Sequence, residues 1–507
     1  MTNAGERRSA RVAMCLAFAA GAAGMLVEIA VARMLGPVVG MTQDSWAALI
    51  GTVLAGTAIG AFAGGLIVDR IRPKLVAVIV ALGAAAYLLV LPAWLPLVLP
   101  DLEGMTRNIA LASLIGLVAL PPSVAIGALT PIAVRIAFAS ESTGRALGRT
   151  YAAGVVGAIA GTFAAGFVLI QNVGVLGTIM AAALLLAGSA AIALVGLDRR
   201  RWGAGALVMV GATVVSASGM RLGPGSLGVP CLIESAYTCI QIDTHPDGFI
   251  QLMLDRVVQG HVLPSNPSVL KNEYMRGFAR ADAILAAAGR WPVEGPNAFV
   301  IGGGAFVYPR FLLTRYPTAR VTISEIDPRV IDVGRQYLGL SDDARMAILN
   351  EDARMVFARA RAGSYDAVYG DAFSDFAVPY HLTTREFAGL VRQSLKPRGA
   401  YILNVIDIQD GGRFMRSFVR TLGSEFNSVT AVAIAPAGYQ RPIRDWPGNF
   451  ILIATQEPLT PAQLTALADQ GAEVLTLTDL ALDAPDTALL TDDYAPTDML
   501  LRPLMRR

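Results

Sequence analysis

The stretch Asn297-Ala-Phe-Val-Ile-Gly-Gly-Gly-Ala-Phe-Val-Tyr308, followed by Val321-Thr-Ile-Ser-Glu-Ile-Asp327, decides the fold of the second half of this chain. An apolar run ends in Gly302, Gly303 and Gly304, a helical segment follows, and a second apolar run ends in Glu325. This order predicts the first half of a nucleotide-binding α/β unit. The glycines allow close approach of a ligand, and an acid at the next strand tip can accept hydrogen bonds from ribose hydroxyls. Since a complete GxGxxG and a Walker lysine are absent, a plain βα turn stays the alternative.

The composition divides the chain into two parts. It has 507 residues, 54% of them hydrophobic and 16% charged, with a mean hydropathy of +0.53. Residues from about 11 to about 219 are nearly free of charge between short basic loops, whereas the charge density from about 230 onward is that of a globular domain. We therefore predict a multi-span α-helical membrane domain, with the lipid bilayer as its partner, fused to a soluble α/β domain. The net charge of +2 does not indicate a nucleic-acid partner.

The apolar part predicts six membrane spans and a weaker seventh. They lie near 11–34, 46–68, 75–99, 109–138, 150–171 and 174–197, with the weaker run near 203–220. Small residues recur at intervals of four (Gly56, Gly60 and Gly64; Gly157 and Gly161) and predict close helix packing. Pro121, Pro122 and Pro131 predict a break or a kink in the fourth span.

Glu28 is an acid inside the first predicted span. A carboxylate in lipid is costly and normally faces a partner or a cavity, so Glu28 is a membrane-embedded candidate site residue. The alternative is a structural pair between helices.

Basic residues gather in alternate loops, at the N-terminus, after the second span, between the fourth and fifth spans, and after the sixth. By the positive-inside rule these loops are cytoplasmic. If the seventh run crosses, the soluble domain lies outside; if it lies in the interface or turns back, the domain lies inside.

Cysteine and histidine give no metal signature. Cys15, Cys231 and Cys239 form neither a metal-binding spacing nor a disulfide framework, and the three histidines are widely separated. We therefore expect no metal site.

The soluble part predicts a small β-domain followed by a mostly parallel sheet. Residues 229–256 alternate as in a small antiparallel sheet, and 266–289 read as a helix. Strands are expected near 298–302, 320–325, 346–349, 365–370, 400–405 and 449–454, with helices between them. The predicted domains are 1–222 (transmembrane), 229–290 (small β-domain and linking helix) and 291–507 (nucleoside-binding catalytic domain).

Acids follow further strands of the predicted sheet. Asp352 follows the third strand, Asp371 ends the fourth, and Asp375 and Tyr380 come shortly afterwards. Ligands of open α/β sheets bind at the carboxyl ends of the strands, where the glycines, Glu325, Asp352 and Asp371 would gather. We therefore predict a nucleoside site there, although any one of these acids alone is more often a helix cap.

With these residues in view, the soluble part resembles the spermidine synthase (polyamine aminopropyltransferase) family. The resemblance covers about 235–455. It is carried by Glu234-Ser-Ala-Tyr, Leu252-Met-Leu-Asp-Arg-Val-Val-Gln, Gly302-Gly-Gly, Glu325-Ile-Asp, Glu351-Asp-Ala and Gly370-Asp-Ala-Phe-Ser-Asp. The first part resembles the integral-membrane subgroup through Gly24-Met-Leu-Val-Glu, Gly127-Ala-Leu-Thr-Pro and Leu147-Gly-Arg-Thr-Tyr-Ala-Ala.

This resemblance implies a Rossmann-like core of the S-adenosylmethionine methyltransferase type. The co-substrate would be S-adenosylmethionine or its decarboxylated form, the other substrate a small molecule, and the protein a homo-oligomer. Gln259 would lie over the nucleoside, Glu325 would hold the ribose, and Asp352, followed by Ala353, the adenine. Asp371 would lie beside the sulfonium, with Asp375 and Tyr380 as further catalytic candidates.

Two departures from the family pattern affect the expected substrate. Ala305 stands where the family has an Asp that binds the amine of the decarboxylated donor, and Lys271-Asn-Glu replaces a Tyr-His/Gln-Glu acceptor segment. The expected activity is transfer of an aminopropyl or 3-amino-3-carboxypropyl group with release of methylthioadenosine. The alternatives are cyclisation of S-adenosylmethionine to a lactone, methyl transfer, and a nucleoside-binding sensor or transporter without turnover. Since the donor is made in the cytoplasm, we expect a multi-pass inner-membrane protein with a cytoplasmic soluble domain.

Overall fold

The structure, a computed structural model, describes most of the chain. The described residues are 3–40, 42–103, 105–138, 142–197, 207, 211, 231–372, 378–435, 439, 442, 444–468, 472–475, 480 and 482–505. They form two compact units, Met1–Cys239 and Ile240–Arg507. The expected limits at 222, 229 and 290 stay predictions.

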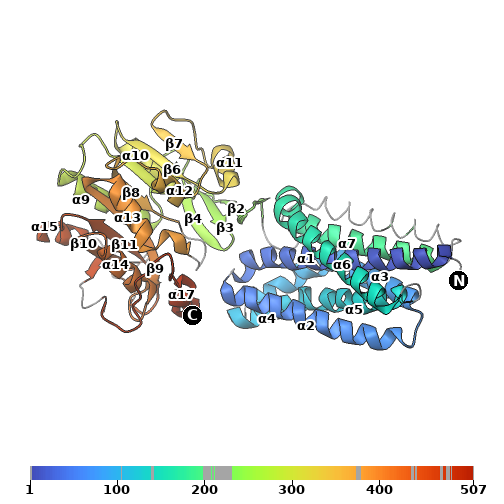
Figure 1. The fold of residues 1–507 in the computed structure, drawn as a ribbon. Helices are drawn as coiled ribbons and strands as arrows, with labels where there is room; N and C mark the ends of the chain where they lie inside the picture. Colours follow the sequence, from blue (N-terminus) through green and yellow to red (C-terminus); the bar gives the residue numbers. More distant parts are fainter. Residues whose placement is uncertain are drawn as a thin grey trace. The chain divides into compact units, whose positions relative to one another are not determined.

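The first unit is helical (Figure 1). Its elements are α1 (Asn3–Val39), α2 (Gln43–Val68), α3 (Pro73–Glu103), α4 (Arg107–Val118), α5 (Leu120–Ala137), α6 (Thr143–Ala164), the π-helix η1 (Ala165–Leu169) and α7 (Ile170–Leu197). Five helical runs among the described residues are long and apolar enough to cross a membrane. The last of them, Thr143–Val195, is interrupted at Gly174 (φ 70°, ψ −175°) and contains the two spans predicted near 150–171 and 174–197. The predicted run near 203–220 lies outside the described residues.

Small residues let these helices approach closely, as their spacing predicts. A Cβ built on Gly60 of α2 would lie 1.9 Å from the carbonyl oxygen of Val124 in α5, and one on Gly157 of α6 would lie 2.1 Å from that of Phe18 in α1. The predicted break in the fourth span is also present, because α4 ends at Val118 and α5 begins at Leu120. Pro121 then occupies the first turn of α5, where its missing N–H costs no hydrogen bond.

A small antiparallel sheet precedes the large one, as predicted. Its strands are β1 (Ile233–Glu234), β2 (Cys239–Thr244), β3 (Ile250–Leu254) and β4 (Val257–Val262), in the order β1-β2-β3-β4. A tight turn at Asp255 (φ 52°) and Arg256 joins β3 to β4 and pairs Leu254 with Val257, and the register of the two strands shifts between Leu252 and Met253.

The large sheet has the order β12-β10-β11-β9-β8-β5-β6-β7. Its strands are β5 (Asn297–Ile301), β6 (Arg320–Ser324), β7 (Met346–Leu349), β8 (Tyr365–Gly370), β9 (Leu395–Ile408), β10 (Ser428–Ile434), β11 (Pro447–Thr455) and β12 (Ala472–Leu475). The run β7-β6-β5-β8-β9 is parallel, and β11, β10 and β12 are antiparallel to their neighbours. All six predicted strands are present, and β10 and β12 are two strands that the sequence analysis did not predict.

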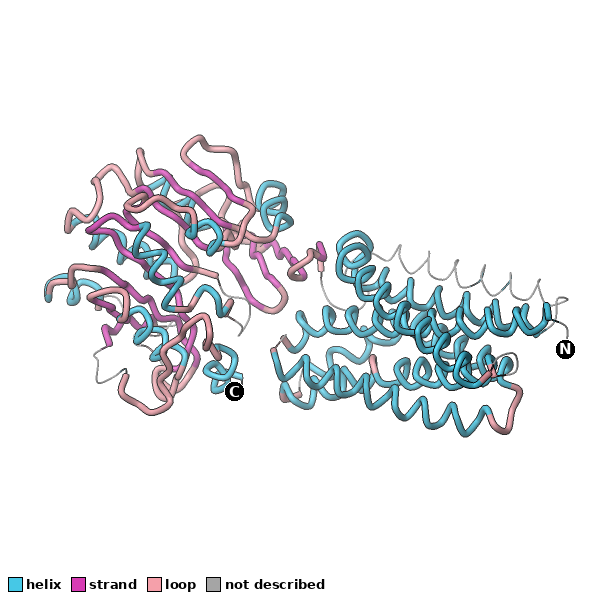
Figure 2. The backbone as a smooth tube through the Cα atoms, in the orientation of Figure 1, coloured by secondary structure: helices cyan, strands magenta, loops and turns pink. Residues whose placement is uncertain are grey.

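Helices cover the large sheet (Figure 2). They are α9 (Glu273–Ala287), α10 (Val307–Arg315), α11 (Pro328–Tyr337), α12 (Ala353–Ala358), α13 (Arg385–Ser394), α14 (Phe414–Gly423), α15 (Pro461–Leu467) and α17 (Thr497–Met505), with a 3₁₀ turn η3 (Tyr380–Leu382). The helix predicted over 266–289 begins only at Glu273, because the preceding residues form turns in which Asn266 accepts a hydrogen bond from the backbone of Val269. The mostly parallel, Rossmann-like fold was thus predicted correctly.

One sequence expectation is wrong. Cys231 and Cys239 form a disulfide, with their Cα atoms 5.6 Å apart. The bond closes a short loop around β1, a geometry that spacing alone does not reveal, and it leaves Cys15 as a free thiol.

Candidate active site

The predicted acids meet at the carboxyl edge of the large sheet. Neighbouring strands β8, β5, β6 and β7 end in Asp371, the glycine turn, Glu325 and Asp352, so these groups follow one another along the edge in that order. From β5 the chain continues to β6 and β7 on one side of the sheet, whereas β8 and β9 lie on the other side of β5. The strand order therefore reverses between β5 and β8, and ligands of open α/β sheets bind at such a switch point.

The glycine turn is set by close backbone packing. Gly302 has φ +89°, and a Cβ there would lie 2.8 Å from the carbonyl oxygen of Asp371. Gly304 has φ +48° and faces Gln259 of β4. Glycine is therefore required at Gly302 by the approach of β8, which brings Asp371 against the turn.

Glu325 is held rigidly beside this turn. Its side chain accepts hydrogen bonds from the backbone N–H of Gly303 (2.8 Å) and of Asp327 (2.9 Å) and is 7% exposed. Burial raises the pKa of the Glu325 carboxyl, and these hydrogen bonds oppose the rise. Each carboxylate oxygen retains further acceptor capacity, so two ribose hydroxyls remain chemically compatible with it.

Asp352 has both a helix-cap contact and a neighbouring imidazole. Its Oδ1 accepts from the N–H of Arg354 (2.7 Å) and caps α12, whose first residue is the buried Ala353. Its Oδ2 lies 2.9 Å from His381 Nε2. The helix-cap alternative is therefore present at Asp352, and its role toward adenine stays a prediction.

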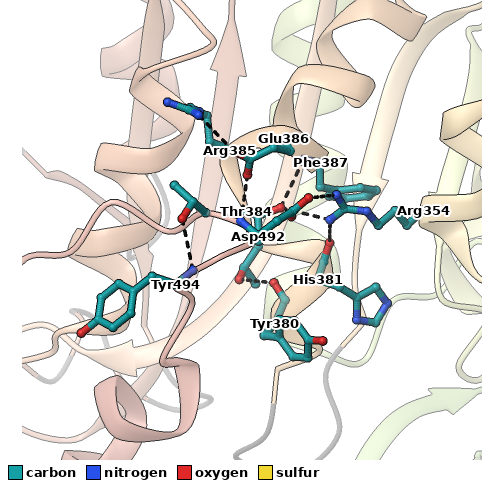
Figure 3. A network of polar contacts seen from close by, with 11 residues as sticks. Arg354, Tyr380, His381, Thr384, Arg385, Glu386, Phe387, Asp492 and Tyr494 are labelled. Carbon is teal, nitrogen blue, oxygen red and sulfur yellow. Dashed lines mark hydrogen bonds and ion pairs between the residues drawn. The ribbon is translucent and has the colours of Figure 1, made fainter.

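Arg354 extends this region to the C-terminal segment (Figure 3). Its guanidinium donates to the carbonyl oxygen of His381 (2.7 Å) and to Thr384 (3.1 Å), and it forms an ion pair with Asp492. The N–H of Asp492 in turn donates to Glu386 (3.0 Å). These contacts fix the loop that carries His381 beside Asp352.

Asp371 is a buried acid that two side chains hold in place. Tyr274 donates to its Oδ2 (2.9 Å) and Asn404 to its Oδ1 (3.2 Å), while Asn449 supports Asn404 (2.9 Å). Burial raises the pKa of Asp371 to about 6, against the lowering effect of the two hydrogen bonds. Asp371 is therefore an oriented carboxylate that is ionised at neutral pH and can take up a proton.

Tyr274 and Asn404 were missed by the sequence analysis. Tyr274 lies on α9, directly after the divergent Lys271-Asn-Glu segment, and its hydroxyl also lies 3.3 Å from the carbonyl oxygen of Gln259. Burial and the nearby Asp371 raise the pKa of Tyr274 well above its usual range, so the hydroxyl keeps its proton. An apolar helix face carrying a tyrosine is the only sequence signal for it, and Asn404 has none beyond its position in a buried strand.

The other predicted residues are less closely connected to Asp371. Gln259 is half-buried on β4 beside Gly304, whereas Tyr380 is 56% exposed and its ring packs against His381. Asp375 lies outside the described residues.

Glu28 is half-buried in α1, and among the described residues it has no ion-pair partner. Nor do those residues include a cluster of three or more His, Cys, Asp or Glu arranged for a metal ion.

The fold and this edge define a Rossmann-like domain with a small antiparallel sheet before it. Residues 281–438 match the spermine/spermidine synthase domain. The match lies within the second unit of the chain.

Two relatives illustrate the match. The chain is 29% identical over 283 residues to the probable polyamine aminopropyl transferase of Bifidobacterium longum, covering 53% of this chain and 61% of that protein. It is 27% identical over 216 residues to the polyamine aminopropyltransferase of Vibrio vulnificus, covering 40% and 68%. The chain thus spans less than two thirds of the length of the first relative and slightly more than two thirds of the second.

Among solved structures, a probable spermidine synthase from Corynebacterium glutamicum is similar with a TM-score of 0.45 and 23% identity. The similar region covers 51% of this chain and 95% of that one.

Proposed function

We propose that the second unit transfers a three-carbon group from a sulfonium nucleoside to an amine and releases methylthioadenosine, and that the helical unit of the same chain is embedded in a membrane. The observation that carries this proposal is Asp371, an oriented carboxylate at the switch point of the sheet, one strand away from the nucleoside-binding turn. Glu325 would hold the ribose and Asp352 the adenine.

The reaction needs positioning more than activation. The carbon–sulfur bond breaks with its electron pair leaving on sulfur, so the sulfonium becomes a neutral thioether. The amine lone pair forms the new carbon–nitrogen bond, and the proton lost from nitrogen passes to Asp371, whose pKa of about 6 leaves it ionised at neutral pH. Holding the amine in line with the breaking bond supplies the remaining rate enhancement.

Ala305 bears on which donor is used. Its side chain is 2% exposed, and its methyl group lies 3.1 Å from a Cβ built on Gly260 of β4. This position offers no carboxylate to attract the amine of the decarboxylated donor and none to repel the carboxylate of intact S-adenosylmethionine. We therefore expect intact S-adenosylmethionine to be used at least as well, giving a 3-amino-3-carboxypropyl product, or a lactone if the donor's own carboxylate attacks.

Competition between the two donors tests this function. Purified protein is incubated with intact and decarboxylated S-adenosylmethionine together, with a deuterated S-methyl group on the intact donor only, with and without an amine. The sulfur nucleosides are identified by mass spectrometry, and the deuterium shows from which donor each was released. Methylthioadenosine released mainly from the intact donor supports the proposal. S-adenosylhomocysteine would indicate methyl transfer instead, no turnover would indicate a binding protein, and a strong preference for the decarboxylated donor would refute the role of Ala305.

A further inference from the structure

The described contacts mark one end of the helical unit near its N-terminus. The guanidinium of Arg8, early in α1, donates to the carbonyl oxygen of Val195, in the last turn of α7. The chain therefore leaves α7, at Leu197, beside the start of α1.

A second set of contacts, within the same unit, marks the opposite end. The guanidinium of Arg33, late in α1, donates to the carbonyl oxygens of Ser235 (2.7 Å) and Tyr237 (2.6 Å). The carboxylate of Glu234 accepts from the N–H of Val175, at the beginning of α7 after the Gly174 break. The segment 233–237 is thus hydrogen-bonded to the C-terminal part of α1 and to the beginning of α7.

These two ends are separated by the thickness of a membrane. About 20 residues of α7 lie between Val175 and Val195, and at 1.5 Å per residue they rise about 30 Å, the thickness of the hydrocarbon core. The chain leaves one end at Leu197 and is fastened at the other by Glu234. Leu197 and Glu234, the described residues on either side of this part of the chain, therefore lie at opposite ends of the helical unit.

The charge of the two ends differs. The end where α7 finishes carries basic residues at the N-terminus and around the two loops that join described helices there: Arg7, Arg8 and Arg11; Arg70, Arg72 and Lys74; and Arg135, Arg145 and Arg149. In the sequence, Arg199 to Arg201 follow shortly after α7. The loops at the other end, around 40–42 and 104–106, are flanked by Asp44, Asp101 and Glu103, with Arg107 as the one loop cation in the sequence there. The positive-inside rule makes the first end cytoplasmic.

The disulfide is an independent observation on the same segment. Cys231 and Cys239 flank the fastened residues, and stable disulfides belong to oxidising compartments rather than to the cytoplasm. Forming the bond removes two electrons and two protons from the thiols, which a disulfide-donating oxidoreductase of such a compartment accepts.

We propose that the second unit works on the non-cytoplasmic side of the membrane. The Cys231–Cys239 disulfide then crosslinks the segment that directly precedes this unit. Ile240, the first residue of that unit, follows Cys239 directly, so chain continuity places it on the side opposite the basic loops. This placement is the reverse of the sequence-based expectation. On the proposed function, donor and acceptor would be met outside the cytoplasm, but the placement does not depend on that function.

Reporter fusions to the wild-type chain test the placement in a Gram-negative host. Alkaline phosphatase joined to the C-terminus is expected to be active, and green fluorescent protein at the same point to be dark. A fluorescent fusion with an inactive phosphatase would overturn the proposal. Methylthioadenosine release measured on the same membranes reports separately on the transfer reaction.

Thiol labelling tests the disulfide in the full chain with Cys15→Ser as background. A membrane-impermeant maleimide is expected to label intact cells only after reductant. Adding Cys231→Ser should allow labelling of Cys239 without reductant, at least tenfold above the background chain. Labelling of the background chain without reductant would refute the disulfide. If the Cys231→Ser chain does not accumulate, the reporter fusions still decide the side.

Discussion

At the scale of single residues, the proposed catalytic role of Asp371 comes with a cost to stability. For Asp371→Asn we expect turnover to fall by at least about 100-fold, since general-base catalysis contributes factors of this size, while methylthioadenosine binding is retained. The substitution can keep the hydrogen bonds of the site, because the new amide can donate to the Tyr274 oxygen while Tyr274 donates to the Gln259 carbonyl. Turnover and binding are measured on the same preparation, and full turnover would reduce Asp371 to a structural role.

The pH dependence of Asp371 has a definite sign. Its pKa is raised to about 6 in the folded chain, so the wild type is expected to lose turnover as the pH falls through 6. Because the pKa of Asp371 is higher in the folded chain than its unfolded value of about 4, ionisation of this buried carboxyl destabilises the fold. The stability of the protonated form is present below pH 4 and is lost as the pH rises through 6. Asp371→Asn should therefore be more stable than the wild type at pH 8, by about 1–3 kcal/mol, and should lose that advantage near pH 4. Melting temperatures at the two pH values test this; an advantage that does not change with pH would contradict it.

Glu325 is expected to contribute to nucleoside affinity. Removing a hydrogen bond to a charged group costs about 1.5–3 kcal/mol, so Glu325→Ala should weaken methylthioadenosine binding by roughly 10- to 150-fold in calorimetry. Asp332→Ala is the matched control, because Asp332 lies exposed on the nearby helix α11 in an ion pair with Arg329. Since Glu325 also binds two backbone N–H groups, Glu325→Gln separates lost affinity from a distorted turn. Equal affinity of Glu325→Ala and wild type would exclude Glu325 from the site.

At the scale of elements, the close packing of α2 against α5 depends on Gly60, whereas Gly65 of the same helix has no such contact. For Gly60→Ala we expect a clear fall in melting temperature, because the new methyl would meet the Val124 carbonyl, a backbone atom that no side-chain rotation can move. Overpacking of this kind costs about 1–3 kcal/mol. Gly65→Ala is the control on the same helix, since nothing lies within 4 Å of its added methyl. If both variants melt together, α2 and α5 do not depend on this contact.

The elements that the sequence predicts best are those whose signals are local. Strands β5 to β8 are short runs rich in apolar residues, each followed within two residues by glycine or an acid, and in a parallel sheet such runs bring their ends to one edge. Strand β12 has only four residues, and its place depends on pairing with β10, which a local pattern does not encode. The contact between Tyr274 and Asp371 joins residues 97 positions apart on a helix and a strand, so it also needed the fold.

At the scale of the whole molecule, the two units have separate cores and one of them contains the candidate site. The core of the second unit is built from residues between Phe299 and Leu504, whereas the helical cores use residues between Val12 and Ala193. Gln259, Tyr274, Glu325, Asp352 and Asp371 all belong to the second unit. Residues 231–507 produced alone, under oxidising conditions that keep the disulfide, are therefore expected to melt cooperatively and to bind methylthioadenosine within about threefold of the full chain. Thermal melting and calorimetry measure both properties, with Glu325→Ala in the same shortened chain as the non-binding control. A shortened chain that folds but does not bind would mean that the helical unit supplies part of the nucleoside site.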